Sequence, residues 1–298
     1  MVFLLRLGRK IKIPHLYILL ILPTILFIFG ACGKAPKESY SFDLTKEERA
    51  WMEDFFTGIM IQEEAIYTLW GSKSMTIFPI DSYTDEEKEA LIEQLPEEQK
   101  KSAVLFKNYD LANNWGKWER IRERFSIEGY LLFKREHPDS PKHALIYFVN
   151  TQQLALTLQM NYELFRRETG MDFDPVEVVF NMEKWPNFWE EIFDNPALDN
   201  AALIGILFGY GFENSFCFQW KWWSSPELEK FANSLHFHFS DQQQSGEATL
   251  DHLSLPVFAS FSKHDKMIEK YKKEREEIKK TYVGKDFLDV TLKKLIAN

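Results

Sequence analysis

The stretch YLLFKREHPDSPKHALIYFV, residues 130–149, carries the one clear strand signal in the sequence. Its two ends, residues 130–135 and 144–149, are rich in aromatic and β-branched side chains. The residues HPDSPKH between them include two prolines and an aspartate, which favour turns. The pattern therefore predicts a β-hairpin. Because an isolated hairpin is only marginally stable in water, we expect this one to pack against helices.

The sequence on both sides of the hairpin is patterned for helices. Thr45 and Glu48 fit a capping box, and apolar residues follow at helical spacing as far as Gly71, with an interruption expected near Gly58. Residues 72–82, which contain Pro79, are predicted to form a loop. Further helices are expected over residues 84–95, 111–125, 150–167, 227–235, 264–281 and 287–295, and after the Asp174-Pro175 cap. Gly170 is expected to cap the C-terminus of the helix over residues 150–167.

At least eight helices against one hairpin predict a mainly α (α+β) fold, with residues 44–298 as a single globular domain. The 298 residues include 36 Lys and Arg against 45 Asp and Glu, for a net charge of −9. An acidic chain without a basic block in its main body is a poor binder of phosphate backbones, so we expect no nucleic-acid partner. Two cysteines cannot form a disulfide framework.

The N-terminus has the features of a secretory signal. Four basic residues precede an apolar run over residues 16–31, and no acidic residue occurs before Glu38. The run is 16 residues long, which is short of the roughly 20 that a membrane-spanning helix needs. A positive start, a short apolar stretch and small residues at its end are typical of a signal peptide.

The segment Phe29-Gly30-Ala31-Cys32 resembles the lipobox of bacterial lipoproteins, although Phe29 stands where that family has an aliphatic residue. The resemblance implies a signal peptide over residues 1–31, a palmitate-type lipid anchor on Cys32 and a polar tether over residues 32–43. The alternative is an uncleaved signal anchor. Gly33 is not the Asp that retains some lipoproteins at the inner membrane, which favours the outer membrane. We therefore expect a lipid-anchored protein of the cell envelope.

Three further segments resemble recurring signatures of an uncharacterised bacterial protein family. They are residues 66–73, residues 205–216, and residues 271–295 with their Gly284-Lys285-Asp286-Phe287 sequence. This resemblance implies no activity.

The most apolar internal stretch covers residues 201–212 and is too short to span a membrane, so it predicts a buried helix. Gly205 and Gly209, four residues apart, are expected to let a neighbouring element approach closely. Glu213, Asn214 and Ser215 follow directly, and we expect them to satisfy backbone groups at a kink near Gly211. The alternative is that they face a pocket, because burying polar groups costs free energy unless they are paired.

Several other residues are candidates for functional sites. Cys217, between two phenylalanines, is predicted to be an inert core residue. The adjacent carboxylates of Glu63-Glu64 and of Glu190-Glu191 are predicted to be solvated. His236 and His238 match no zinc motif. Residues 220–223 (WKWW) are predicted to pack, with membrane-interface contact or glycan stacking as alternatives.

The sequence thus predicts an envelope lipoprotein that acts as a binding, structural or accessory component. Its expected partners are the membrane, through the lipid anchor, and an envelope protein. No catalytic, cofactor-binding or metal residue is assigned, and no cofactor is expected. The alternative is an envelope hydrolase, for instance one directed at glycan, with a site near Lys73, Glu213 and Asn214. That alternative requires these three residues to share one concave pocket.

Overall fold

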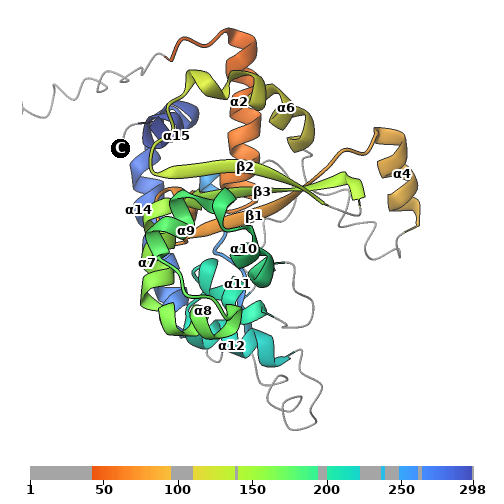
Figure 1. The fold of residues 1–298 in the computed structure, drawn as a ribbon. Coiled ribbons are helices and arrows are strands. Elements are labelled where there is room, and N and C mark those ends of the chain that lie inside the picture. Colours follow the sequence, from red (N-terminus) through yellow and green to blue (C-terminus); the bar gives the residue numbers. More distant parts are fainter. Residues whose placement is uncertain are drawn as a thin grey trace, which may run out of the picture. The chain divides into compact units, whose positions relative to one another are not determined.

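The computed structural model describes residues 42–94, 110–137, 140–193, 200–221, 236–238, 248–260 and 264–296. All of them belong to one compact unit, Tyr40–Asn298. The fold is mainly helical with a small antiparallel sheet, as the sequence predicts (Figure 1). The helix predicted over residues 227–235, Trp222, Trp223 and the whole signal region with Cys32 lie outside the described residues.

A three-stranded antiparallel sheet forms the centre of the fold. Its strands are β1 (Met75–Asp81), β2 (Tyr130–His137) and β3 (Ser140–Asn150), in the order β1-β3-β2. The predicted hairpin is therefore confirmed as β2 and β3. A second, two-stranded sheet pairs β4 (His236–His238) with β5 (Phe258–Ser260).

The loop predicted over residues 72–82 is wrong, because this segment contains β1. The strand pairs with β3 from Met75, opposite Val149, to Asp81, opposite His143. Proline cannot donate a hydrogen bond to a neighbouring strand, and it is tolerated in sheets mainly on edge strands. Pro79 is exposed on just such an edge strand, which reconciles it with the sheet.

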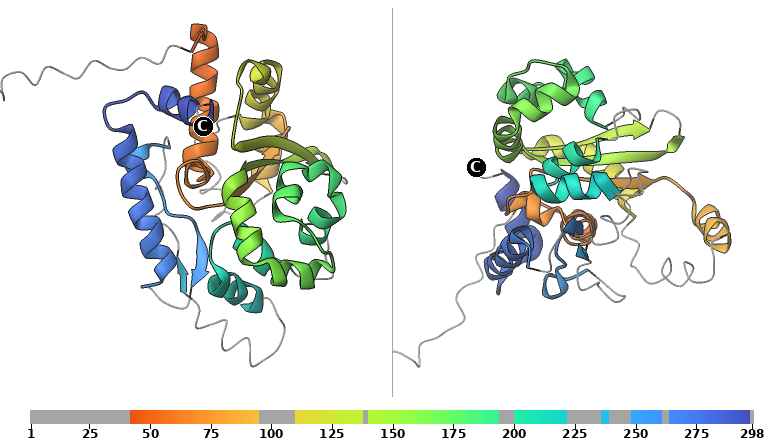
Figure 2. Two further views of the ribbon diagram at one scale, coloured as in Figure 1. Left: turned by 60° about the vertical axis from the view of Figure 1, so that its left-hand side comes forward. Right: turned by 90° about the horizontal axis from the view of Figure 1, so that it is seen from below.

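Helices cover both faces of the sheet (Figure 1), and Figure 2 shows α7 to α9 on one side with α2 and α14 on the other. Successive strand residues point to opposite faces. Accordingly, Ile146 and Phe148 of β3 join one hydrophobic core, whereas Tyr147 and Val149 join another. A sheet buried on both faces explains why both ends of the hairpin read as nearly continuous apolar runs.

The first core includes residues from α2 (Lys46–Thr57), the π-helical segment η1 (Gly58–Gln62), α3 (Ile66–Leu69), α6 (Leu111–Ile121), α14 (Lys266–Tyr282) and α15 (Phe287–Ile296). The second includes residues from α7 (Thr151–Met160), α8 (Tyr162–Thr169), α9 (Pro175–Phe180), α10 (Pro186–Phe193) and α11 (Ala201–Leu207). The remaining described elements are α4 (Asp85–Glu93), α12 (Phe212–Lys221) and the 3-10 turns η2 (Arg122–Arg124), η3 (Met182–Lys184) and η4 (Leu250–His252).

Local capping signals in the sequence mark the helix boundaries correctly. Thr45 and Glu48 form both hydrogen bonds of the capping box that begins α2, and η1 interrupts the following pattern at Gly58. Asp174 caps α9 ahead of Pro175, and Gly170 ends α8 with φ +69°. Among the helices of the described residues, none is both long and apolar enough to cross a membrane.

Candidate functional site

The turn between α11 and α12 brings two helices into close contact. Gly209 and Gly211 adopt φ values of +79° and +83°, which favour glycine. A Cβ atom on Gly205 would lie 2.7 Å from the Oγ of Ser215 on α12. The close approach predicted for these glycines is therefore confirmed.

The polar residues after this turn satisfy its backbone, as predicted. Ser215 Oγ donates a hydrogen bond to the Gly211 carbonyl at 2.7 Å. Asn214 Nδ2 donates to the Tyr210 carbonyl at 3.0 Å and to Asp265 Oδ1 at 3.2 Å. Both partners of Nδ2 are acceptors, so they fix the orientation of the amide. Asn214 Oδ1 is then left buried, with no hydrogen-bond partner among the described residues.

Asn214 also lines a cavity of about 330 Å³ between α11, α12 and the segment that enters β5. We call this cavity the α11–α12 pocket. Its wall is mostly apolar and is formed chiefly by Ile204, Phe208, Tyr210, Phe218, Val257 and Phe258. Asn214 and Ser215 both line this pocket, and both also satisfy the backbone of the turn. The two roles that the sequence suggests for these residues therefore apply at the same time.

A cluster of buried charges adjoins this pocket. Lys73 is 4% exposed, and its Nζ lies 5.8 Å from the ring centroid of Phe208. Burial lowers the pKa of Lys73, although the charges of Glu63 and Glu64 oppose that effect. Within the described part of the chain, Lys73 forms no ion pair at 4.0 Å or less. Lys73 therefore interacts with the charges of Glu63 and Glu64 without a direct salt bridge.

Glu63 and Glu64, which were predicted to be solvated, are both partly buried. Burial raises the pKa of Glu64 to about 7, against the opposing charge of Lys73 and a hydrogen bond with Ser254. Burial also raises the pKa of Glu63. Glu64 has φ +58°, an uncommon value for a residue other than glycine, and it lies two residues after the end of η1. Glu190, in contrast, is exposed as predicted, whereas its neighbour Glu191 is partly buried.

Tyrosine hydroxyl groups surround the charged cluster. Tyr210 belongs to the pocket wall, and its pKa is raised by burial and by the charge of Glu64. Tyr271 donates a hydrogen bond to the Gly209 carbonyl at 2.9 Å, and Tyr67 donates to the Ser254 carbonyl at 2.7 Å. Through Phe208 and Tyr210, the apolar pocket and the buried charges form one continuous region.

The three residues of the hydrolase alternative do not share the α11–α12 pocket. Asn214 lines it, Lys73 lies against Phe208 and is not part of its wall, and Glu213 is exposed. Sequence reasoning missed the burial of Glu64 and the role of Tyr210. The available signal was the position of Glu63-Glu64 inside the apolar sequence IMIQEEAIYTL, residues 59–69, where solvation of both carboxylates is unexpected.

The other candidates have structural surroundings. Cys217 is fully buried, and burial raises the pKa of its thiol to about 12, which agrees with an inert core residue. His236 and His238 both lie in β4. Among the described residues, no group of three side chains is placed to hold a metal ion. Trp220 is partly buried and lies 6.1 Å from Phe216, ring to ring.

The candidate site is therefore an apolar pocket that is lined in part by Asn214, whose amide oxygen lacks a donor among the described residues, with the charged cluster of Lys73, Glu63 and Glu64 next to it. Such a pocket can bind an apolar molecule and orient it through one hydrogen bond. Comparison of the chain with known protein families, curated proteins and solved structures finds no match.

Proposed function

We propose that this chain is a lipid-anchored protein of the bacterial cell envelope that binds a small, largely apolar ligand in the α11–α12 pocket. Asn214 carries the binding proposal, because the residue lines the pocket and its Oδ1 is buried without a donor among the described residues. Buried polar groups in folded proteins are nearly always hydrogen-bonded. A ligand with an N–H or O–H group would supply the hydrogen-bond donor that Asn214 Oδ1 lacks.

The chemistry of the pocket favours binding over hydrolysis. Ligand sites are mostly apolar cavities of about 300–1,000 Å³ with few polar groups, and the pocket of about 330 Å³ lies at the small end of that range. The raised pKa of Glu64, about 7, suits general acid–base chemistry. However, Glu64 and Lys73 do not belong to the pocket wall, and Glu213 is exposed. Catalysis at Lys73, Glu213 and Asn214 therefore lacks the shared pocket that it needs.

The anchoring part of the proposal rests on the sequence. The four basic residues, the short apolar run and the Phe29-Gly30-Ala31-Cys32 segment support lipid attachment at Cys32. Cleavage before Cys32 would remove Arg6, Arg9, Lys10 and Lys12 and no acidic residue, so the mature chain would be more acidic than the net charge of −9. An outer-membrane location and an envelope protein partner remain parts of the same proposal.

Replacing Cys32 with alanine is expected to abolish incorporation of a clickable palmitate analogue in a bacterial host, because the thiol is the attachment point. Labelling followed by gel fluorescence of the purified chain measures this. Cys217→Ala is the matched control, since Cys217 is buried and should not affect labelling. Persistent labelling of the Cys32 variant would contradict the lipobox interpretation.

The pocket is expected to bind N-phenyl-1-naphthylamine, an apolar fluorescent amine with a single N–H group. Its N-methyl derivative cannot donate to Asn214 Oδ1 and should bind about fivefold more weakly, the equivalent of one net hydrogen bond. Fluorescence titration gives both dissociation constants. Equal affinities for the two probes would remove the role assigned to Asn214.

A variant that fills the α11–α12 pocket provides a second test of naphthylamine binding. Ile204→Trp places a large ring in the pocket wall and should abolish binding of the naphthylamine. Leu156→Trp on α7 adds the same ring at a side chain that is 48% exposed, and it should leave binding unchanged. Unchanged binding in Ile204→Trp would show that the probe sits elsewhere.

A further inference from the structure

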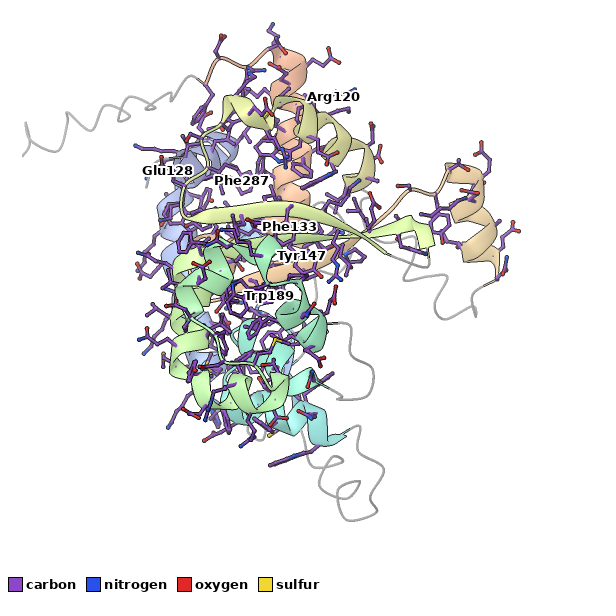
Figure 3. All side chains as sticks on the ribbon, in the orientation of Figure 1. Arg120, Glu128, Phe133, Tyr147, Trp189 and Phe287 are labelled. Carbon is purple, nitrogen blue, oxygen red and sulfur yellow. The ribbon has the colours of Figure 1, made fainter. Side chains whose placement is uncertain are left out.

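A second cavity lies on the face of the sheet that α10 covers. It has a volume of about 460 Å³, and its wall includes Leu131 and Phe133 of β2, Tyr147 of β3, and Trp189 and Phe193 of α10. We call it the sheet-face pocket. Figure 3 shows Phe133, Tyr147 and Trp189 following one another from the sheet to α10. The sheet-face pocket shares no wall residue with the α11–α12 pocket.

The wall of the sheet-face pocket is a connected set of aromatic rings. Phe133 and Tyr147 are opposite each other in the strand register, and their rings stack at 4.9 Å with an angle of 6°. Trp189 and Phe193, one helical turn apart, stack at 6.0 Å and 14°. Tyr147 and Phe193 join the two pairs edge to face at 5.8 Å. Such a wall favours a flat aromatic guest, because rings stack or meet edge to face.

Trp189, which lines this pocket, has an indole N–H without an acceptor among the described residues. Trp189 is 5% exposed, and its Nε1 is buried with no hydrogen-bond partner among the described residues. Trp115 and Trp118 have unpartnered Nε1 atoms as well, but they are not part of this wall. An indole N–H can only donate. Leaving such a group unsatisfied costs about 1–3 kcal/mol, so a guest that brings an acceptor would be favoured.

Charges near the sheet-face pocket limit the guest further. Its wall includes the carboxylates of Glu183 and Glu190, which are both exposed, and the guanidinium of Arg135. Two negative groups against one positive group disfavour an anionic molecule. We propose that the sheet-face pocket is a second ligand site, which takes an uncharged planar aromatic compound with a hydrogen-bond acceptor such as a ring carbonyl.

The probe for this site is 7-diethylamino-4-methylcoumarin, a neutral planar carbonyl compound whose fluorescence rises in apolar surroundings. It should bind the full chain, and 7-diethylaminocoumarin-3-carboxylate should bind at least tenfold more weakly because of its charge. Trp189→Phe keeps an aromatic ring but removes the N–H, so it should weaken binding of the neutral coumarin about fivefold. Equal binding by wild type and Trp189→Phe, or equal binding of the two coumarins, would overturn the proposal.

A filling variant keeps the test decisive if Trp189→Phe folds poorly. Leu131→Trp occupies the sheet-face pocket and should abolish coumarin binding while leaving naphthylamine binding at the α11–α12 pocket intact. Ile204→Trp should do the reverse. Coumarin binding that survives Leu131→Trp would reject this second site without affecting the first, and naphthylamine binding that survives Ile204→Trp would reject only the first.

Discussion

Gly209→Ala is expected to lower the free energy of unfolding by about 4 kcal/mol. The residue has φ +79°, and an L-residue in this region costs about 1–2 kcal/mol. A Cβ atom would lie 2.6 Å from Tyr271 Oη and 3.1 Å from Lys73 Cα. Tyr271 is fully buried and donates to the Gly209 carbonyl, so it has to move or lose a hydrogen bond worth about 1 kcal/mol. Overpacking adds about 1–3 kcal/mol.

The matched control for Gly209→Ala is Gly170→Ala. Gly170 has φ +69°, but no atom lies within 4 Å of the Cβ that alanine would add. This variant should therefore show only the backbone cost, about 1–2 kcal/mol. Urea unfolding of the two variants and the wild type measures the difference. If both variants lose the same stability, the contact between the α11–α12 turn and Tyr271 is not tight.

Glu64→Gln is expected to stabilise the fold increasingly as the pH rises from about 4.5 to about 7. Burial raises the pKa of Glu64 from 4.5 to about 7 in the folded chain. The folded state therefore holds the proton of Glu64 more tightly than the unfolded state. The stabilisation from this proton is complete below the unfolded pKa and is lost as the pH rises through the folded pKa. Above pH 7 the loss approaches roughly 3 kcal/mol, at about 1.4 kcal/mol per pKa unit.

The difference between the pH–stability curves of wild type and Glu64→Gln reports the ionisation of Glu64 together with its effect on Lys73. Lys73 and Glu63 remain in both chains, but the variant lacks the Glu64 charge that helps to raise the Lys73 pKa, so the downward shift of the Lys73 pKa is larger in the variant. Urea unfolding between pH 4 and 8 supplies the curves. Glu190→Gln on α10 is the control for losing one exposed carboxylate. A difference curve that is flat, or that favours the wild type at high pH, would contradict the burial of Glu64.

The elements that the sequence predicts correctly are those with a local cause. The capping box at Thr45 and Glu48, the Asp174-Pro175 start of α9 and the Gly170 end of α8 each depend on residues within one helical turn. The β2–β3 hairpin likewise depends on two adjacent runs and their turn. Strand β1 was missed because its sequence, MTIFPID, includes a proline. Only pairing with β3, which lies far along the chain, makes this segment a strand.

In the candidate site, too, the features with a local cause could be predicted from the sequence and those with a long-range cause could not. The role of Asn214 and Ser215 at the kink could be predicted because their partners lie four residues away. The positions of Lys73, Glu213 and Asn214 relative to one another could not be predicted from the sequence. Neighbours on a helix point about 100° apart, so Glu213 faces solvent while Asn214 faces the interior. The partial burial of Glu64 involves Ser254, which lies about two hundred residues further along the chain and also accepts the hydrogen bond of Tyr67.

The sequence by itself determined the helix ends, the hairpin, the mainly α class and the lipobox resemblance, because each is a pattern in neighbouring residues. Only the tertiary structure decided which polar groups lost their water. It placed Asn214 Oδ1, Trp189 Nε1 and the Glu64–Lys73 cluster in apolar surroundings. Desolvation depends on everything packed around a group, and those atoms come from segments distant in the chain. The two proposed ligand sites rest on that property.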